Sequence, residues 1–123
     1  MFSHIMIGTN DLDKAKAFYD AVLGTLGVSP GRVDRYRVFY RTPTGTFGVT
    51  KPIDGQPATH ANGGTIGFLC NSPEQAAAWH AAGLANGATS IEDPPGVREG
   101  TKVFLAYMRD PDGNKLCALH RLP

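Results

Sequence analysis

Apolar and polar side chains alternate along several short stretches of the chain, and a two-residue period is typical of β-strands. The clearest stretch covers residues 101–108, and the turn sequence after it, Arg109-Asp110-Pro111-Asp112-Gly113, leads into a returning strand at 116–120. Proline presets φ in such a turn, and glycine accepts positive φ at no steric cost. The same alternation predicts strands at 3–9, 35–41, 46–50 and 65–70, with a weaker signal near 27–33.

Two other stretches keep the 3.6-residue spacing of an amphipathic helix. The first follows the cap residues Asn10-Asp11 and is ended by Gly24 and Gly27. The second begins at Ser72-Pro73-Glu74-Gln75, a capping box with proline at the first helical position, and is stopped by Asn86-Gly87.

The order strand, helix, strands occurs twice, which indicates two copies of one unit. At an offset of 61 positions Asn10 aligns with Asn71 and Phe18 with Trp79, whereas the turns at 41–45 and 109–113 align at an offset of 68. The second copy therefore carries about seven extra residues, which we place at 92–100. We predict a single domain of two repeats, at about 1–51 and 64–123, joined by a connector at 52–63.

Composition narrows the class of protein. The chain has 123 residues, enough for one domain with a sizeable core, and its net charge of +1 gives no reason to expect a nucleic-acid or membrane partner. No apolar run approaches the roughly 18 residues of a membrane span, and we see no signal peptide. Cys70 and Cys117 do not make a disulfide framework, so we expect a cytoplasmic protein.

Two ordered groups of residues suggest a family. The chain opens with His4 on a strand and Phe18-Tyr19 on a helix, and closes on Asp110-Pro111-Asp112-Gly113-Asn114. With the internal repeat, this set resembles the vicinal-oxygen-chelate superfamily, which includes glyoxalase I, extradiol dioxygenases, and fosfomycin and bleomycin resistance proteins. The resemblance implies an α+β fold of two βαβββ modules, at about 3–50 and 64–121. Their mixed sheets would form a U-shaped, barrel-like surface around a cleft, with helices outside and often a homodimer.

Arginine positions indicate which strand face lines this cleft, because an unpaired arginine cannot lie beneath a helix. On the strand at 35–41, Arg35, Arg37 and Phe39 are expected to face the cleft, while Tyr36, Val38 and Tyr40 face the helix. The 68-residue offset carries this pattern to the second copy. The candidate ligand-binding residues are Arg35, Arg37, Phe39, Phe47, Tyr107 and Met6.

The chemistry of these candidates suggests a type of ligand. Guanidinium groups bind carboxylates and phosphates, and aromatic rings stack on planar molecules. We therefore expect a cleft for an amphipathic ligand that can be anionic. The alternative is a solvated strand whose arginines have Asp34 or Glu99 as counterions.

The resemblance also implies metal-ligand positions, which here hold His4, Val49, Thr65 and Cys117. Val49 has no donor atom and Thr65 only a neutral hydroxyl, whereas an open catalytic metal site commonly has about three protein ligands. We therefore expect no cofactor and a metal-independent small-molecule-binding protein, with no catalytic residue assigned. The alternatives are a metal-dependent lyase or dioxygenase of glyoxalase type, its divalent metal site divergent or completed by a dimer partner, and a dimer without a ligand.

Overall fold

The computed structural model describes residues 1–123, and each half of the chain contributes one helix and one mixed sheet. The first half comprises β1 (His4–Gly8), α1 (Leu12–Gly24), β2 (Arg32–Asp34), β3 (Arg37–Thr42) and β4 (Gly45–Thr50). These strands lie in the order β1-β4-β3-β2, and β1 runs parallel to β4 while the other pairs are antiparallel.

The second half repeats this arrangement with β5 (Ile66–Leu69), α2 (Pro73–Ala85), β6 (Thr89–Ser90), β7 (Gly96–Val97), β8 (Val103–Arg109) and β9 (Lys115–Arg121). Its strand order is β5-β9-β8-β6, and β7 also pairs with β8. The predicted α+β fold with two mixed sheets is confirmed, but the sheets do not close into a barrel. The short strand β7 lies inside the stretch that we expected to be an insertion loop.

The two predicted helix starts are observed as side-chain caps. The Asp11 side chain accepts a hydrogen bond from the Lys14 amide, and the Ser72 side chain accepts one from the Gln75 amide. The Gln75 side chain in turn accepts a bond from the Asn71 amide. These bonds satisfy amide groups that have no partner in the first turn of a helix.

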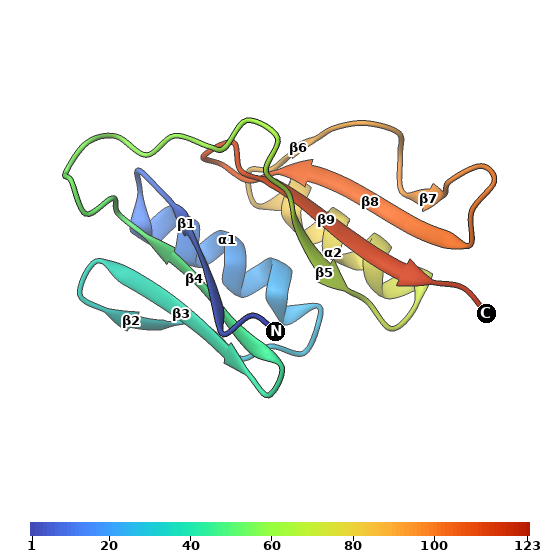
Figure 1. Cartoon of the computed structure of the whole chain (residues 1–123), viewed down its shortest axis with the longest axis horizontal. Coiled ribbons are helices and arrows are strands. Elements are labelled where there is room, and N and C mark those ends of the chain that lie inside the picture. The colour runs from blue at the N-terminus through green and yellow to red at the C-terminus, as the bar shows by residue number, and fades with distance from the viewer.

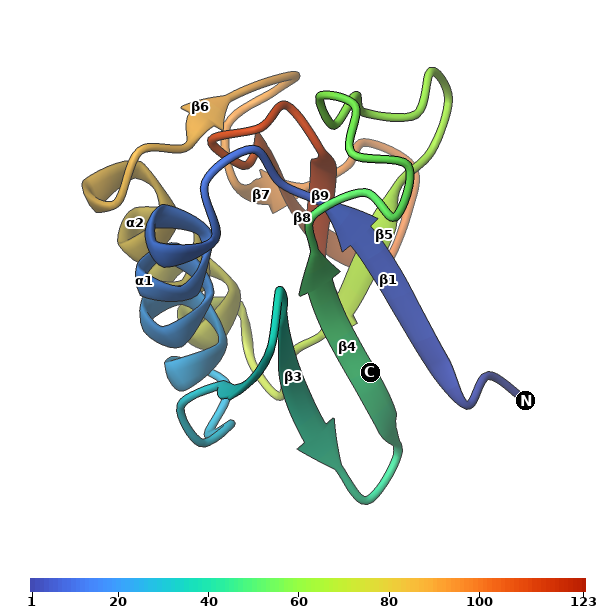
Figure 2. The same ribbon diagram turned by 90° about the vertical axis from the view of Figure 1, so that its left-hand side faces the viewer.

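The helices form one layer and the sheets the other. In Figure 2, α1 and α2 lie together on one side, while the longer strands of both halves lie on the other side and the short strand β6 lies above the helices. A cluster of 16 buried residues fills the space between the layers and includes side chains from both halves. Phe47 and Phe68 join the halves directly, with ring centroids 5.5 Å apart in an edge-on arrangement. Neither helix combines the length and apolar character that a membrane span requires.

The turn between β8 and β9 binds the first half through a buried carboxylate. Asp110 is only 4% exposed, and it accepts hydrogen bonds from the Tyr19 hydroxyl, the Asp112 amide, and the amide and side chain of Asn114. Asn114 also donates to the Gly8 carbonyl. Burial, with the neighbouring Asp110 charge, raises the pKa of Tyr19 well above its ordinary value, so its hydroxyl stays a donor.

The connector crosses from β4 to β5 above the sheets (Figure 1) and is held by one side chain. Asn10 donates to the Ala58 carbonyl at 3.1 Å and accepts from the Ala58 amide at 2.7 Å. Gly8 permits this close approach, because a Cβ there would lie 3.0 Å from the Ala58 Cβ. The connector is thus fixed against the end of β1.

Candidate functional site

The two faces of β3 have different environments. Val38 and Tyr40 are buried on the side of α1, while Arg37, Phe39 and Arg41 alternate with them on the uncovered side. The prediction that Arg37 and Phe39 lie away from the helix agrees with this arrangement. We call the uncovered side of this sheet the first open face.

Arg35 does not belong to this face. β3 begins at Arg37, and Arg35 lies in the preceding turn with φ 58°, the left-handed region. It lines a separate hollow that also includes Asn10, Asp11 and Asp13. The expectation that Arg35 and Arg37 share a strand face is therefore wrong, because the strand starts two residues later than the alternation suggested.

Cation–π contacts order the arginines of the first open face. The Arg41 guanidinium carbon lies 4.5 Å from the centroid of the Phe39 ring, and that of Arg37 lies 5.6 Å from it. Arg37 also lies 5.2 Å from the centroid of the Tyr36 ring. Such contacts contribute about 0.5–1 kcal/mol at exposed sites and hold the guanidinium groups against the sheet.

A cavity of about 410 Å³ opens on this face, and its lining residues are Ser3, His4, Met6, Arg37, Phe39, Arg41 and Thr46. Met6 lies across Gly48, where a Cβ would come within 2.2 Å of its sulfur atom. The absence of a side chain at Gly48 therefore gives Met6 its place beside Phe39. His4 and Met6 both line this face, as we expected.

The cations of the first open face have little internal compensation. Arg37 approaches Asp34 only at 3.9 Å, and Arg41 makes no ion pair. The Arg37 Nε atom is buried without a hydrogen-bond partner. The Arg37 side chain as a whole is 34% exposed, so the accessible part of its guanidinium can donate to an acceptor on a bound molecule.

Phe47 and Val49 do not face this side, and their predicted orientation is wrong. Both are buried in the core, and the Phe47 ring centroid lies 4.9 Å from that of Tyr19. The cause is the turn length: Arg41 pairs with Thr46, five positions on, whereas Arg109 pairs with Lys115, six positions on. A shift of one residue moves every side chain to the opposite face of a strand.

Tyr107 lies on the uncovered side of the second sheet, as predicted, among fixed charges. The Lys115 ammonium lies 5.0 Å from its ring centroid and forms an ion pair with Glu92 at 2.5 Å. Arg98, 5.9 Å from the same centroid, donates to the main-chain carbonyls of Asp93, Pro94 and Gly96. Burial and the neighbouring Cys117 raise the pKa of Tyr107.

The structure does not bring all the predicted ligand-binding residues into one cleft. Tyr107 lines none of the five principal cavities, and the cavity beside Arg37 and Phe39 is formed by the first half alone. Within one chain, only Met6, Arg37 and Phe39 of the predicted residues lie together. Arg41, which was not among the candidate ligand-binding residues, joins them.

The predicted metal-ligand positions do not form a site. His4 is exposed, and its Nδ1 lies 2.7 Å from the Ser3 hydroxyl. Cys117 is buried, and this burial raises the pKa of its thiol, which disfavours the thiolate that binds metals. Val49 lies in the core, and no three His, Cys, Asp or Glu side chains gather where they could hold a metal ion. The residues of one chain therefore do not form the divalent metal site that the family resemblance implies.

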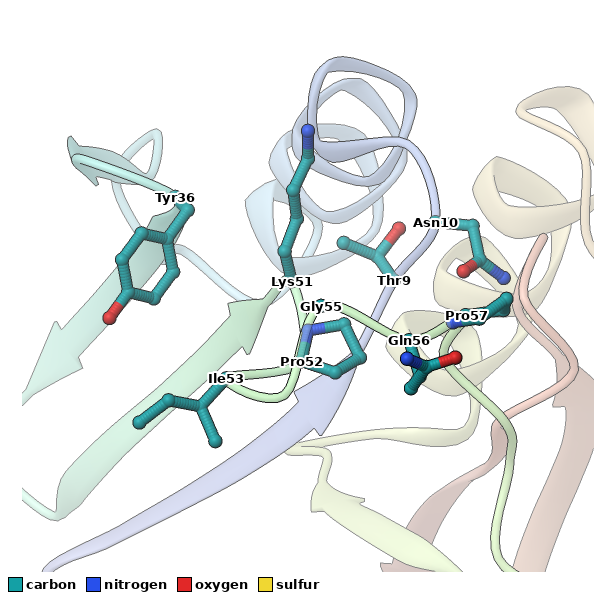
Figure 3. A pocket seen from close by; sticks show the side chains of 9 residues that line it. All are labelled: Thr9, Asn10, Tyr36, Lys51, Pro52, Ile53, Gly55, Gln56 and Pro57. Carbon is teal, nitrogen blue, oxygen red and sulfur yellow. The ribbon is translucent and has the colours of Figure 1, made fainter.

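A larger cavity, of about 530 Å³, lies beneath the connector. Figure 3 shows Tyr36 and Ile53 on one side of it and Asn10 and Gln56 on the other, with Lys51 pointing towards the helix layer. Sequence reasoning missed this cavity, although the prolines and glycines of the connector are typical of a fixed loop. Tyr36 lines this cavity and also contacts Arg37, so the cavity lies next to the first open face.

The chain contains two strand–helix–strands units that pack against each other through their helices. Comparison of its sequence with known families identifies the class of protein that has this fold. A model of the glyoxalase/bleomycin resistance protein/dioxygenase superfamily matches residues 1–118. The chain belongs to this superfamily.

Solved structures agree with this assignment. The chain is 64% identical to a glyoxalase/bleomycin resistance protein from Albidiferax ferrireducens T118, with a TM-score of 0.96, covering 98% of this chain and 99% of the other. A lactoylglutathione lyase from Agrobacterium tumefaciens shares the fold at 20% identity, with a TM-score of 0.69 and coverage of 98% and 92%. No functionally curated protein matches the sequence.

Proposed function

We propose that the chain is a small-molecule-binding protein whose ligand occupies the first open face without the help of a metal ion. The observation that carries this proposal is the pair of weakly compensated guanidinium groups, Arg37 and Arg41, that line one cavity on this face. A ligand carboxylate or phosphate that accepts from the accessible N–H groups of these guanidiniums would add charge-assisted hydrogen bonds.

The surroundings of Arg37 indicate the rest of the ligand. Arg41 supplies a second guanidinium on the same face, while Phe39 and Met6 supply apolar surface between and beside the two charges. An amphipathic molecule with one anionic group and a compact apolar body matches this distribution. Its affinity should fall with rising salt, because exposed charges are screened.

We further propose a cytoplasmic homodimer with no nucleic-acid or membrane partner. Leu69 is 73% exposed and pairs with Leu119, which pairs with Leu105 across the second sheet. A second copy covering this apolar row would remove it from water. The two cysteines are free, as expected of a reducing compartment.

A metal-dependent lyase or dioxygenase is the alternative function. It would require donors from a second chain, because His4 and Cys117 do not form a three-ligand set with any neighbour. Elemental analysis after a mild chelator wash separates the two functions. About one metal ion per chain, lost in the variant His4→Ala, would favour the enzyme.

Titration calorimetry with benzoate and phenyl phosphate tests the binding function. Hydrogen bonds to charged groups contribute about 1.5–3 kcal/mol, so Arg37→Gln and Arg41→Gln should each weaken binding by about tenfold or more. Arg121→Gln is the control, because it removes the same charge from an exposed end of β9. Equal losses in all three variants would indicate only long-range attraction and would contradict a site at Arg37.

A further inference from the structure

A separate cavity lies in the seam between the two halves and is lined by residues of β1 and β5. These two strands are each at an edge of their sheet (Figures 1 and 2). We call this cavity the seam cavity; its volume is about 220 Å³. Residues of both halves line it, including Leu23 and Phe47 from the first half and Ile66 and Phe68 from the second. It shares only Ser3, His4 and Thr46 with the cavity beside Arg37.

The floor of the seam cavity is apolar and aromatic. Phe47 and Phe68, which meet edge-on with centroids 5.5 Å apart, line it together with Leu26 and Val28. An apolar hollow of this kind leaves its lining atoms without contacts on one side, so a molecule that fills it gains dispersion energy and buries apolar surface.

The charge of the lining distinguishes this cavity from the first open face. None of its 16 lining residues is an aspartate, glutamate, lysine or arginine. An ionised ligand would lose hydration here without gaining a counterion, so the cavity selects against charge. Polar atoms are present at the rim, where the Thr42 and Thr44 hydroxyls lie 3.2 Å apart. The Thr42 hydroxyl is already engaged, because it donates to the Gly45 carbonyl and accepts from the Thr44 amide. The Thr44 hydroxyl keeps capacity for a further hydrogen bond.

The volume indicates the size of the ligand. An apolar protein cavity of about 150 Å³ accommodates benzene. The seam cavity is larger, at about 220 Å³, and can hold one ring with a short substituent. We propose that the seam cavity is a second binding site, specific for small neutral aromatic molecules that carry one hydroxyl group. It is distinct from the anion site on the first open face, with which it shares only Ser3, His4 and Thr46.

Benzyl alcohol and benzoate are matched probes, because they share a ring and differ in charge. Benzyl alcohol should shift the methyl resonances of Leu26, Val28 and Ile66 in a saturable way, and leave those of Leu105 and Leu119 on the second sheet unchanged. Benzoate should leave the seam resonances unchanged, whether or not it binds at Arg37. Loss of benzyl alcohol binding would therefore contradict the seam site alone, and loss of benzoate binding would contradict the site at Arg37 alone.

Filling the cavity provides the decisive variant. Val28→Phe should weaken benzyl alcohol binding by about tenfold or more, whereas Val33→Phe, the same exchange at an exposed position of β2 outside the seam, should not. If Val28→Phe does not fold, Thr44→Phe, on the exposed hairpin turn, is used in its place. Absence of saturable shifts at the seam, or unchanged affinity in the filled variant, would overturn the proposal.

Discussion

The two halves have the same strand order but differ in what covers the open face of each sheet. In the first half, Arg37 and Arg41 lie on bare strand, and only a 3.9 Å approach to Asp34 compensates either charge. In the second half, the insertion places Glu92 against Lys115, and Arg98 binds three main-chain carbonyls. Lys115 and Arg98, the cations beside Tyr107, therefore already have partners within the chain.

This difference shows how one repeated unit can serve two purposes. Arg98 and Lys115 already bind groups of the insertion, so they are not available to bind a ligand. The open face of the second sheet is therefore less suited to ligand binding than that of the first. The first half has no corresponding insertion and keeps its donors free. Under the proposed function, similar sheets would therefore have different roles because their loops differ.

The helices show a second difference between the halves. Tyr19 of α1 and His80 of α2 occupy corresponding positions, 61 residues apart, and both are buried. The Tyr19 hydroxyl donates to Asp110 in the other half, whereas His80 Nε2 lies 3.0 Å from the Ser90 hydroxyl in its own half. Only one of the two helices therefore uses this position to hold the halves together.

The largest expected effect comes from removing the shared carboxylate. Asp110→Ala leaves the Tyr19 hydroxyl and three nitrogen donors of the turn without their acceptor, and should lower the free energy of unfolding by roughly 3 kcal/mol or more. Ser90→Ala removes the single hydrogen bond between the Ser90 hydroxyl and His80, which occupies the position corresponding to Tyr19. This change should lower the free energy of unfolding by about 1 kcal/mol. Urea denaturation measures both values. Equal losses would contradict the asymmetry between the helices.

A smaller effect should appear in the dependence of stability on pH. Burial lowers the pKa of His80 below its ordinary value of 6.5, and a hydrogen bond with the Tyr107 main chain only partly opposes this. The unfolded chain therefore binds a proton more readily than the folded chain. Stability is complete above about pH 6.5 and falls as the pH drops from there towards the lower pKa of the folded state.

The variant His80→Gln checks this pH dependence. Its unfolding free energy should fall less steeply between about pH 7 and pH 5 than that of the unchanged chain. His4→Gln, which removes an exposed histidine of the first half, is the control. A pH profile that changes with His4 rather than His80 would reverse the comparison.

Local signals in the sequence were sufficient to predict most of the fold. Asp11 and Ser72 cap the helices as expected, and the strand alternation around Val38 and Ala106 matches their burial. Caps, turns and periodicity depend on neighbours in the chain, so a single sequence contains them. The two-residue strand β7 is too short to show any period.

The candidate site was harder to predict, because its errors come from features that are not local. One additional residue in the second hairpin turn reversed the expected orientation of Phe47, and no pattern within the strand reveals that difference. The seam cavity and the role of Asp110 depend on how the halves pack, which the repeat alone does not specify. Arg37 and Phe39 were placed on the correct face because the arginines of β3 restrict the orientation of that strand.

The bond between Tyr19 and Asp110 also has a consequence for the order of folding. Its partners lie 91 positions apart in the chain, so it belongs to the slow, long-range contacts that raise contact order. During synthesis, α1 is complete long before Asp110 is added, and the first half must wait for a carboxylate that arrives near the end of the chain. Until then its core-facing aromatic residues depend on nearby contacts alone, which makes the nascent first half the stage most exposed to aggregation.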